Sequence, residues 1–447
     1  MPDPSTPAVF DVAILGNGAA GTLLALHLAR APGRALRVAL VGTGEAGHGV
    51  AYSTPFAEHV LNVPAAGMSA FDGEAADFAR FVESVGGLDA VNAPFAPRQL
   101  YGDYLGTRLA ESFGASPHRL QHVPARAIGV DRRGDAITIA LDDGTAIAAR
   151  HVVLALGNQA RRLPFDAPVL DSWDWAAIRA LPADADVLVV GSGLSMADAV
   201  LSLDARGHRG IIHVLSRHGR MPLPHALGHA PWPVDIDALC ALPLRARLHA
   251  LRDIAREAAR TGAPWQSVLD GVRPHVRRLW RSLTPADQAR FLRHGVRLWD
   301  IHRHRIAPHV HGMLGELQST GRLHVHRARL QALTARGDRI HASATRGSGP
   351  LELDVDAVID ATGVETGASA MGQPLVDALL ASGRARPGPH GLGLDGDADG
   401  RVLDAHGSAH PDLWMLGGLR LGTLWETTAI PDLRKDAAAL AARLAGD

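Results

Sequence analysis

The sequence contains almost no cysteine and almost no lysine. Cys240 is the only cysteine among the 447 residues, so no disulfide can form within the chain and no Cys-x-x-Cys redox pair is present. This excludes the dithiol–disulfide reductases. Lys435 is the only lysine. A lysine that forms a Schiff base and the lysine of a phosphate-binding P-loop are therefore not expected.

Long apolar runs and an excess of charge are also missing. No run of about 18 apolar residues occurs, which predicts no membrane-spanning helix. Residues 1–9 lack the basic start and apolar core of a signal peptide, so we expect a protein of a bacterial-type cytoplasm. The formal net charge of −1 gives no indication of a nucleic-acid partner. The length of 447 residues and the apolar content of 47% predict two or three globular domains.

A glycine-rich turn follows an apolar segment near the N-terminus. Residues 10–15 have the length and composition of a buried strand, and a helix is expected over 19–30. Glycines between such elements allow a tight turn, close approach of the backbone to a pyrophosphate, and close packing of helix on strand. The N–H groups that begin the helix would face the phosphates. The pattern predicts an FAD site, and its residues are Gly16, Gly18, Ala19, Ala20 and Gly21.

The end of the next strand departs from the usual pattern. This strand is expected over 36–41, and an acidic residue at its end would bind the ribose of the dinucleotide. Gly42 stands there instead, and the nearest acid is Glu45. The ribose contact therefore stays open between the Thr43 hydroxyl, Glu45 and water.

A second strand–turn–helix pattern begins at residues 187–190. Its glycines are in the same positions, except that Met196 replaces the third. The following strand, expected over 211–215, ends in a hydroxyl and an arginine rather than the carboxylate that suits NAD, so we expect a 2′-phosphate and a preference for NADPH, with NADH possible. The residues predicted to bind this nucleotide are Gly191, Gly193, Leu194, Ser195, Ser216 and Arg217.

Two further apolar segments frame the second turn. Residues 151–158, which contain Gly157, are expected to end the first part of an FAD domain. Residues 356–363, which end in Thr362 and Gly363, are expected to return the chain to that domain and to support flavin binding. Alternatively, both segments are ordinary buried strands.

The predicted fold class is α/β, with two Rossmann-like dinucleotide-binding domains. The FAD domain is expected over 1–165 and 350–447, and an inserted NAD(P) domain over 166–349. The inserted domain should carry a helical insertion at about 235–305. The expected packing anchors of that insertion are Trp265, Trp280 and Trp299.

Three segments have features that Rossmann packing does not require. They are residues 47–69, 95–105 and 413–431, and the cofactor contacts expected from them are Tyr52, Asn62, Met68, Arg98, Gly417 and Thr427. Asn62 is expected near the isoalloxazine ring, and Asn62 and Arg98 are the candidate catalytic residues. A surface crossover and the core packing of Tyr101 and Tyr104 are the alternatives for the first two segments. In the third, a helix start would stabilise negative charge on a reduced flavin.

The segment 299–305 alternates histidine with arginine. No cysteine or cluster of acids accompanies His302 and His304, so the ligand set for a metal is poor and no metal is expected. A solvated or substrate-facing basic stretch, near an acidic substrate or the NADP phosphates, is the preferred interpretation.

Several longer stretches resemble bacterial FAD/NAD(P)-binding oxidoreductases of the YdhS-like kind. They are GNGAAGT at 16–22, GVAYST at 49–54, LNVPA at 61–65, FAPRQLYGDYL at 95–105, LSRHGRMPLPH at 215–225 and LWETTAIPDLR at 424–434. The resemblance spans nearly the whole chain and implies nucleotide-binding folds, with little further chemistry. The plan is more distantly similar to NADPH-dependent N-hydroxylating flavin monooxygenases. Related sequences commonly place an acid where Gly42 stands.

The leading functional hypothesis is an FAD-dependent monooxygenase that uses NADPH. Hydride would pass from NADPH to FAD, and a C4a-(hydro)peroxide of the reduced flavin would transfer oxygen to a small substrate, with an amine nitrogen as first choice. The cofactor carries this chemistry, so the lack of a persuasive Ser-His-Asp or Cys-His set is no obstacle. An NAD(P)H-dependent reductase or dehydrogenase of a small organic molecule and a non-enzymatic redox-sensing flavoprotein are the alternatives. The expected partners are a small molecule and oxygen, with neither nucleic acid nor membrane.

Overall fold

The computed structural model describes residues 9–86 and 94–446. The chain forms two compact units. The first unit comprises 1–54, 63–159 and 365–447, and the second comprises 55–62 and 160–364. Within the described residues, no helix is both long and apolar enough to cross a membrane.

The first unit is built on an eight-stranded sheet. β18, β6, β1, β2 and β3 lie side by side in that order and run parallel. β5 pairs antiparallel with β4 and β6, and β17 pairs antiparallel with β18. The strands are β1 (Val9–Leu15), β2 (Arg37–Val41), β3 (Arg119–Val123), β4 (Ala127–Arg133), β5 (Ala136–Leu141), β6 (Ala146–Leu154), β17 (Arg401–Leu403) and β18 (Ala409–Met415).

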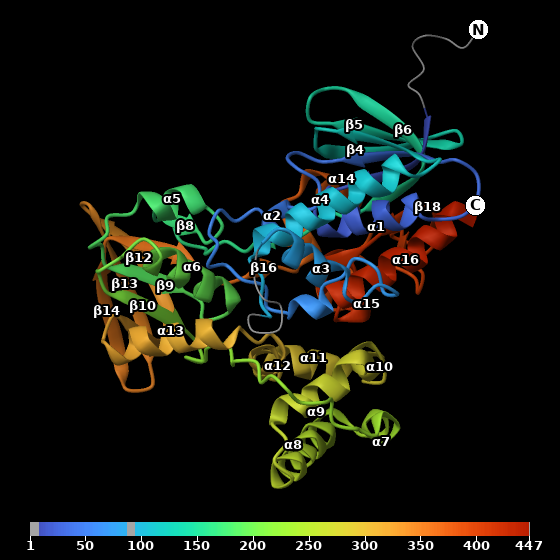
Figure 1. Cartoon of the computed structure of the whole chain (residues 1–447). Helices are drawn as coiled ribbons and strands as arrows, with labels where there is room; N and C mark the ends of the chain where they lie inside the picture. Colours follow the sequence, from blue (N-terminus) through green and yellow to red (C-terminus); the bar gives the residue numbers. More distant parts are fainter. Residues whose placement is uncertain (1–8, 87–93, 447) are drawn as a thin grey trace. The chain divides into compact units, whose positions relative to one another are not determined.

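Helices cover the parallel part of this sheet, which is why its central strands are almost entirely apolar. α1 is buried along most of its length, and both α4 and α16 pack against it (Figure 1). α14 packs on β4 over a separate cluster that includes Leu375 and Val376. The helices are α1 (Ala19–Ala29), α2 (Gly49–Tyr52), α3 (Asp77–Ser84), α4 (Arg98–Gly114), α14 (Pro374–Ala381), α15 (Leu421–Leu424) and α16 (Ile430–Gly446).

The second unit contains a five-stranded parallel sheet in the order β11-β10-β9-β15-β8 and an antiparallel sheet of β12, β13 and β14. Leu188 and Val358 of the first sheet share a core with Ile340 and Val355 of the second. The strands are β8 (Val169–Asp171), β9 (Val187–Val190), β10 (Ile212–Ser216), β11 (Leu323–Arg327), β12 (Arg329–Arg336), β13 (Arg339–Arg346), β14 (Gly349–Val355) and β15 (Ala357–Asp360). The helices beside them are α5 (Trp175–Ala180), α6 (Leu194–Asp204) and α13 (Pro308–Ser319).

The prediction that residues 356–363 return to the first domain is wrong. β15 lies in the second sheet, where Val358 pairs with Leu188 of β9 and Val169 of β8. A short apolar strand fits the interior of either parallel sheet, so its pattern does not specify the sheet that it joins. The chain crosses between the units at residues 54–55 and 62–63, and again at two short strands that pair with each other, β7 (Gln159–Ala160) and β16 (Val364–Glu365).

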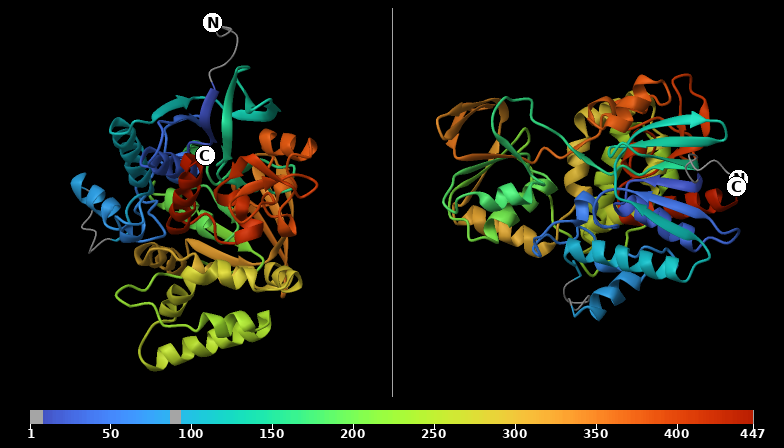
Figure 2. Two further views of the ribbon diagram at one scale, coloured as in Figure 1. Left: turned by 90° about the vertical axis from the view of Figure 1, so that its right-hand side faces the viewer. Right: turned by 90° about the horizontal axis from the view of Figure 1, so that it is seen from above.

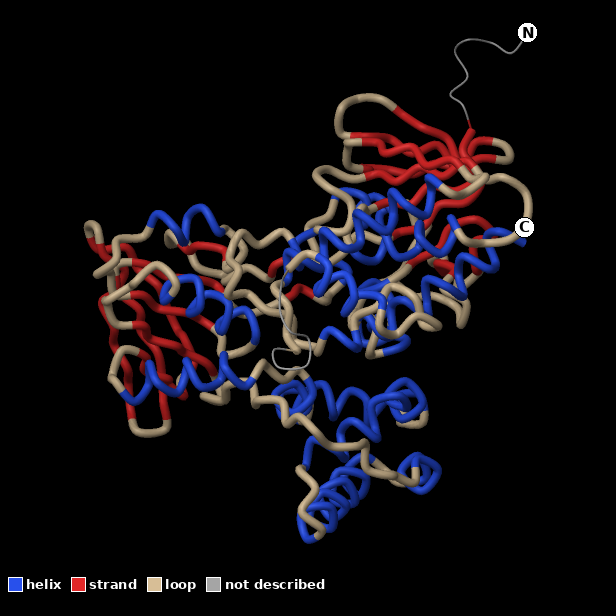
Figure 3. The backbone as a smooth tube through the Cα atoms, viewed as in Figure 1, coloured by secondary structure: helices blue, strands red, loops and turns tan. Residues whose placement is uncertain are grey.

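The region expected to be a helical insertion is helical. Figures 2 and 3 show residues 236–303 as a run of helices joined by loops, without a strand. The predicted anchors are in place: the ring centroids of Trp280 and Phe291 are 6.1 Å apart, those of Phe291 and Trp299 6.5 Å apart, and Trp265 lies 4.9 Å from His302. The helices are α7 (Ile236–Ala241), α8 (Leu244–Arg260), α9 (Trp265–Val272), α10 (Val276–Arg281), α11 (Pro285–His294) and α12 (Val296–Arg303).

Candidate dinucleotide-binding sites

The first glycine turn joins β1 to α1. Gly16 has a φ of +119°, and a β-carbon there would lie 2.1 Å from the carbonyl oxygen of Ala155, just beyond β6. A β-carbon at Gly21 would lie 1.8 Å from the carbonyl oxygen of Gly16. A side chain at either position would collide with the backbone, so the turn closes in this way only with glycine.

Gly18 leaves the start of α1 open. It is the N-cap residue, and neither it nor the first turn of α1 supplies a side chain that caps the helix. The N–H groups at a helix start have no acceptor within the helix, and Ala19 and Ala20 lie in this first turn. A phosphate placed here would accept their hydrogen bonds and meet the positive end of the helix dipole.

The end of β2 is closed by Asn17. The Nδ2 of Asn17 donates to the carbonyl oxygens of Thr43 and Gly44, at 3.3 and 3.0 Å. A β-carbon at Gly42 would lie 2.3 Å from the Oδ1 of Asn17. The carboxamide therefore takes the space that an acidic side chain at position 42 would need. This contact gives a physical reason for the glycine.

A pocket of about 490 Å³ lies beside this strand end. The Nε2 of His48 is 3.0 Å from the Oδ1 of Asp103, and its Nδ1 is 3.7 Å from the Oε2 of Glu45. A β-carbon at Gly102 would come within 2.6 Å of the His48 ring, so the glycine makes room for that ring. Carboxylates suit ribose hydroxyl groups, and dinucleotides bind at the carboxyl ends of parallel strands. The lining residues are Gly44, Glu45, Ala46, His48, Asp103, Gly106, Thr107 and His122.

Three predicted cofactor contacts of the first unit lie on or between α2 and α4. The ring centroids of Tyr52 and Tyr101 are 4.8 Å apart, and burial raises the pKa of Tyr52 against the opposing charge of Arg98. Met68 is almost fully buried. Arg98 begins α4. Core packing accounts for Tyr52 and Met68, and cofactor contact by any of the three stays a prediction.

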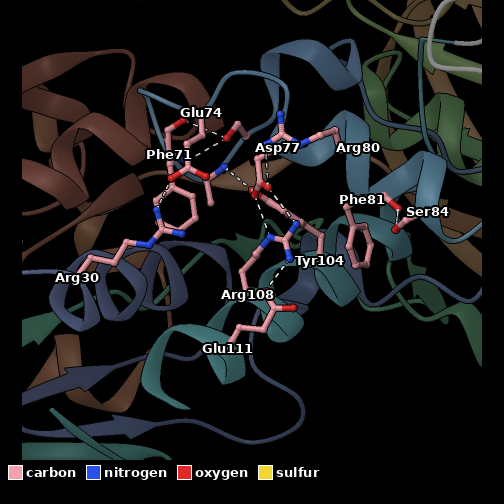
Figure 4. A network of polar contacts seen from close by, with 12 residues as sticks. Arg30, Phe71, Glu74, Asp77, Arg80, Phe81, Ser84, Tyr104, Arg108 and Glu111 are labelled. Carbon is pink, nitrogen blue, oxygen red and sulfur yellow. Dashed lines mark hydrogen bonds and ion pairs between the residues drawn. The ribbon is translucent and has the colours of Figure 1, made fainter. Parts of the chain in front are cut away.

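A polar network holds the loop that carries Met68 (Figure 4). The hydroxyl of Tyr104 donates to Asp77 Oδ2 at 2.7 Å and accepts from the N–H of Ala70 at 3.0 Å. The Nε of Arg108 donates to the same carboxylate at 3.0 Å. Burial alone would raise the pKa of Asp77, but the hydrogen bonds from Arg108 and Tyr104 hold it below its usual value. The network joins α3, α4 and the loop.

The C-terminal segment ties into the same loop and carries unpaired buried groups. Arg434 of α16 donates to the carbonyl oxygen of Ser69 at 3.0 Å and pairs with Asp72 at 2.9 Å. Within the described part of the chain, the hydroxyls of Thr423 and Thr427 are buried without a hydrogen-bond partner. Trp425 between them has a φ of +67°, a strained value for a residue other than glycine. Buried, unpaired hydroxyls beside a strained residue are typical of a ligand site.

The expected strand and glycines of this segment are present. β18 ends at Met415, and Gly417, which has a φ of +78°, begins a 3-10 helix. A β-carbon at Gly418 would lie 3.3 Å from the Oδ1 of Asn158, which follows Gly157 after β6. These glycines therefore lie next to the carboxyl end of β6. Flavin contact by Gly157, Gly417 or Thr427 stays a prediction.

The second glycine turn repeats the first. Gly191 has a φ of +114°, and a β-carbon there would lie 2.1 Å from the carbonyl oxygen of Ala361. Thr362 and Gly363 follow that residue, so they lie beside the second turn, whereas the sequence assigned them to flavin support. Leu194 and Ser195 begin α6, and Gly193 is its N-cap without a side-chain cap. The third-position residue, Met196, is fully buried and does not disturb the turn.

A charged residue that the sequence pattern does not identify as a site residue lies at this turn. The Nη2 of Arg297, on α12, donates to the carbonyl oxygen of Ser192 at 2.8 Å. The predicted contact Ser216 shares a hydrogen bond of 2.8 Å with Ser192, and Arg217 is exposed just beyond it. In the sequence, Arg297 is visible only as an arginine near the start of an expected helix. That feature is too common to identify a site.

The structure bears on the expectations for Asn62 and for the basic stretch 299–305. Asn62 belongs to the second unit, where its carbonyl oxygen accepts from His225 Nε2 at 2.9 Å, whereas Arg98 belongs to the first unit. Flavin contact and a catalytic role for Asn62 stay predictions. The arginines of the stretch 299–305 are not solvated, although His304 is exposed, and a role of this stretch in facing a substrate stays a prediction. Arg303 and Arg305 are buried, and Arg305 is paired with Asp270, because the α9 and α12 region folds around them.

Comparison with known proteins supports the dinucleotide-binding fold. Residues 13–159 match a family model described as FAD-NAD(P)-binding. No curated protein sequence matches the chain. The chain is similar in structure to L-lysine 6-monooxygenase from Pseudomonas syringae, with a TM-score of 0.68, 19% identity and coverage of 97% of this chain and 99% of that one.

Two ornithine hydroxylases are similar to a comparable degree. Ornithine hydroxylase PvdA from Pseudomonas aeruginosa has a TM-score of 0.66 at 16% identity and covers 98% of this chain and 99% of its own. Ornithine N-hydroxylase KtzI from Kutzneria sp. 744, in a structure titled with FADred, NADP+ and L-orn, has a TM-score of 0.64 at 18% identity and the same coverage. At these identities the likeness establishes the fold, and the predicted α/β class with two Rossmann-like units is confirmed.

Proposed function

We propose that the protein is an NADPH-dependent flavin monooxygenase that uses FAD and oxygen to oxidise a small substrate. The observation that carries the proposal is the pair of glycine turns, at Gly16 and Gly191, each closed against the backbone just beyond the end of a neighbouring strand. Two such turns suit two dinucleotides, and the single cysteine excludes a dithiol centre in the chain. Similar folds are found in proteins named as an ornithine N-hydroxylase, an ornithine hydroxylase and an L-lysine 6-monooxygenase.

The residues of the first unit fit FAD. The open start of α1 would hold the pyrophosphate, and the pocket beside β2 would hold the adenosine ribose in place of a strand-end acid. The unpaired hydroxyls of Thr423 and Thr427 would gain partners from the cofactor. When bound, FAD would supply hydride acceptance and reaction with oxygen.

The residues of the second unit fit a second, phosphorylated dinucleotide. The open start of α6 would hold the pyrophosphate, and Ser216 and Arg217 would bind a 2′-phosphate. This arrangement supports NADPH rather than NADH, since no carboxylate ends β10. The chain's own groups then bind and orient two cofactors and exclude water, and none has to act as a nucleophile.

The test is oxygen use by the FAD-loaded protein. We expect NADPH to reduce the bound flavin, oxygen to be consumed, and one of a panel of primary amines, including ornithine and lysine, to yield a hydroxylated product. Absorbance during rapid mixing of the reduced protein with oxygen follows the return of the oxidised flavin. Reduction of the flavin by NADPH without oxygen uptake, with electrons passed instead to an organic acceptor, would replace the proposal with a reductase.

A further inference from the structure

Arg297 places its guanidinium directly on the second glycine turn. Its Nη2 donates to the carbonyl oxygens of Ser192 and Arg220 at 2.8 and 2.7 Å, and it lies 3.2 Å from the Ser192 hydroxyl. Its Nη1 would be 3.6 Å from a β-carbon at Gly193. The helical insertion thus places a cation beside Gly193, the N-cap residue of α6.

The cation belongs to a larger cluster of positive charge. The pKa of His218 is lowered by burial and then by four neighbouring arginines, Arg217, Arg220, Arg297 and Arg327. Arg217 and Arg327 are exposed near the carboxyl ends of β10 and β11, and Arg327 packs against Gly219. The carboxylate of Asp300 raises the pKa of Arg297, whereas burial and the charges of Arg220 and Arg217 lower it. Because all four arginines act on His218 and like charges repel one another, an anion bound among them would be favoured.

Two of the four arginines, Arg297 and Arg217, lie at different parts of this site. Arg297 faces Gly193, the glycine at which a pyrophosphate approaches the backbone. Arg217 follows Ser216, the position from which the 2′ position of the adenosine ribose is read. The cluster therefore offers one cation for the phosphates that every dinucleotide has and another for the phosphate that only NADP has.

We propose that Arg297 binds the pyrophosphate of the second dinucleotide, and that Arg217 alone of the two reads the 2′-phosphate. The inference rests on the proposed function, because it needs the second turn to bind NADP(H). It assigns the helical insertion a role in nucleotide binding, since Arg297 belongs to α12. It also separates affinity for any dinucleotide from selection between NADP and NAD.

The experiment compares Arg297→Ala with Arg217→Ala in the FAD-loaded protein, by calorimetric titration with NADP+ and with NAD+. We expect Arg297→Ala to raise both dissociation constants by about tenfold or more, the effect of losing a charge-assisted hydrogen bond, and to leave their ratio unchanged. Arg217→Ala should raise the constant for NADP+ and leave that for NAD+ unchanged. Arg297→Lys keeps the charge but not the forked donors, so its effect should be intermediate.

Arg293→Ala, an exposed cation at the end of α11 in the same insertion, is the matched control and should change neither constant. Circular dichroism and thermal melting confirm that each variant is folded. Three results for Arg297→Ala would overturn the inference: a dissociation constant that rises for NADP+ alone, unchanged affinity for both nucleotides, or tighter binding of both. A wild-type protein that binds neither nucleotide would overturn the proposed function instead.

Discussion

At the residue scale, the contact between Asn17 and Gly42 decides how the first dinucleotide site can be built. A carboxamide and an acidic side chain at position 42 cannot share that space, because a β-carbon there lies 2.3 Å from Asn17 Oδ1. The nearby pocket offers Glu45 and Asp103 as other carboxylates. Asn17 therefore excludes the usual acidic ribose contact at position 42. Glu45 or Asp103 could supply a carboxylate in its place.

An acidic residue at position 42 should destabilise the protein when Asn17 is present and should be tolerated when Asn17 is replaced by alanine. Gly42→Glu should lower the free energy of unfolding by about 1–3 kcal/mol through overpacking, since Asn17 must give up its bonds to Thr43 and Gly44. The double variant Asn17→Ala with Gly42→Glu should recover more than half of that loss and bind FAD at least as tightly as the wild type. Denaturant unfolding and quenching of flavin fluorescence measure the two quantities.

Gly73→Glu is the control for this pair. A β-carbon at Gly73 meets no atom within 4 Å, so the change should alter stability by less than about 0.5 kcal/mol. Equal loss of stability in the single and double variants would show that the two positions are not coupled.

At the element scale, the network in Figure 4 joins the loop that carries Met68 to both α3 and α4. The Tyr104 hydroxyl serves a backbone N–H and a carboxylate at once. Both partners are buried, so neither finds water when the hydroxyl is removed. The loop should therefore depend on this one hydroxyl far more than on the exposed ion pairs nearby.

Tyr104→Phe should lower the free energy of unfolding by about 1–3 kcal/mol, the cost of leaving a buried polar group unsatisfied. Glu111→Gln, which removes the more exposed partner of Arg108, should cost less than about 1 kcal/mol. Chemical denaturation of both variants checks the contrast. A Tyr104→Phe protein as stable as the wild type would mean that other contacts of the loop, such as the hydrogen bond from Arg434, are sufficient to hold it.

At the scale of the whole molecule, the two units differ in their response to acid. Of the six histidines with a lowered pKa in the described chain, five belong to the second unit, and the pKa values of His225 and His326 fall to about 4. Burial is the largest cause for both, and His213 and His324 add to it for His326. Above pH 6.5 these groups are neutral in both the folded and the unfolded chain. Below pH 6.5, these histidines take up protons in the unfolded chain but stay neutral in the folded chain. The free energy of unfolding therefore falls between about pH 6.5 and about pH 4.

The second unit should therefore melt at a lower temperature at pH 5 than at pH 7, and its loss should exceed that of the first unit. Six of the eight tryptophans belong to the second unit, so tryptophan fluorescence follows mainly that unit, and release of flavin follows the first. His326→Asn should reduce the acid loss and leave the melting temperature at pH 7 within about 2 °C. The idea is wrong if both signals shift equally with pH and His326→Asn has no effect.

The sequence by itself determined both glycine turns, the fold class and the helical insertion. These are local features: a tight turn that excludes a β-carbon, a strand of apolar residues, and a helix period leave their marks within about 10–20 residues. The position of Gly42 was also visible, although its reason was not, because Asn17 lies 25 residues earlier and its side-chain direction is set by the turn.

Only the tertiary structure decided which sheet β15 joins, what faces Gly42, and that Arg297 reaches the second turn. The Arg297 contact spans 105 positions in the sequence. An apolar strand pairs equally well with either sheet, and a helical arginine has no sequence mark of its target. Such choices follow from strand order and from packing across the chain, and local pattern does not encode them.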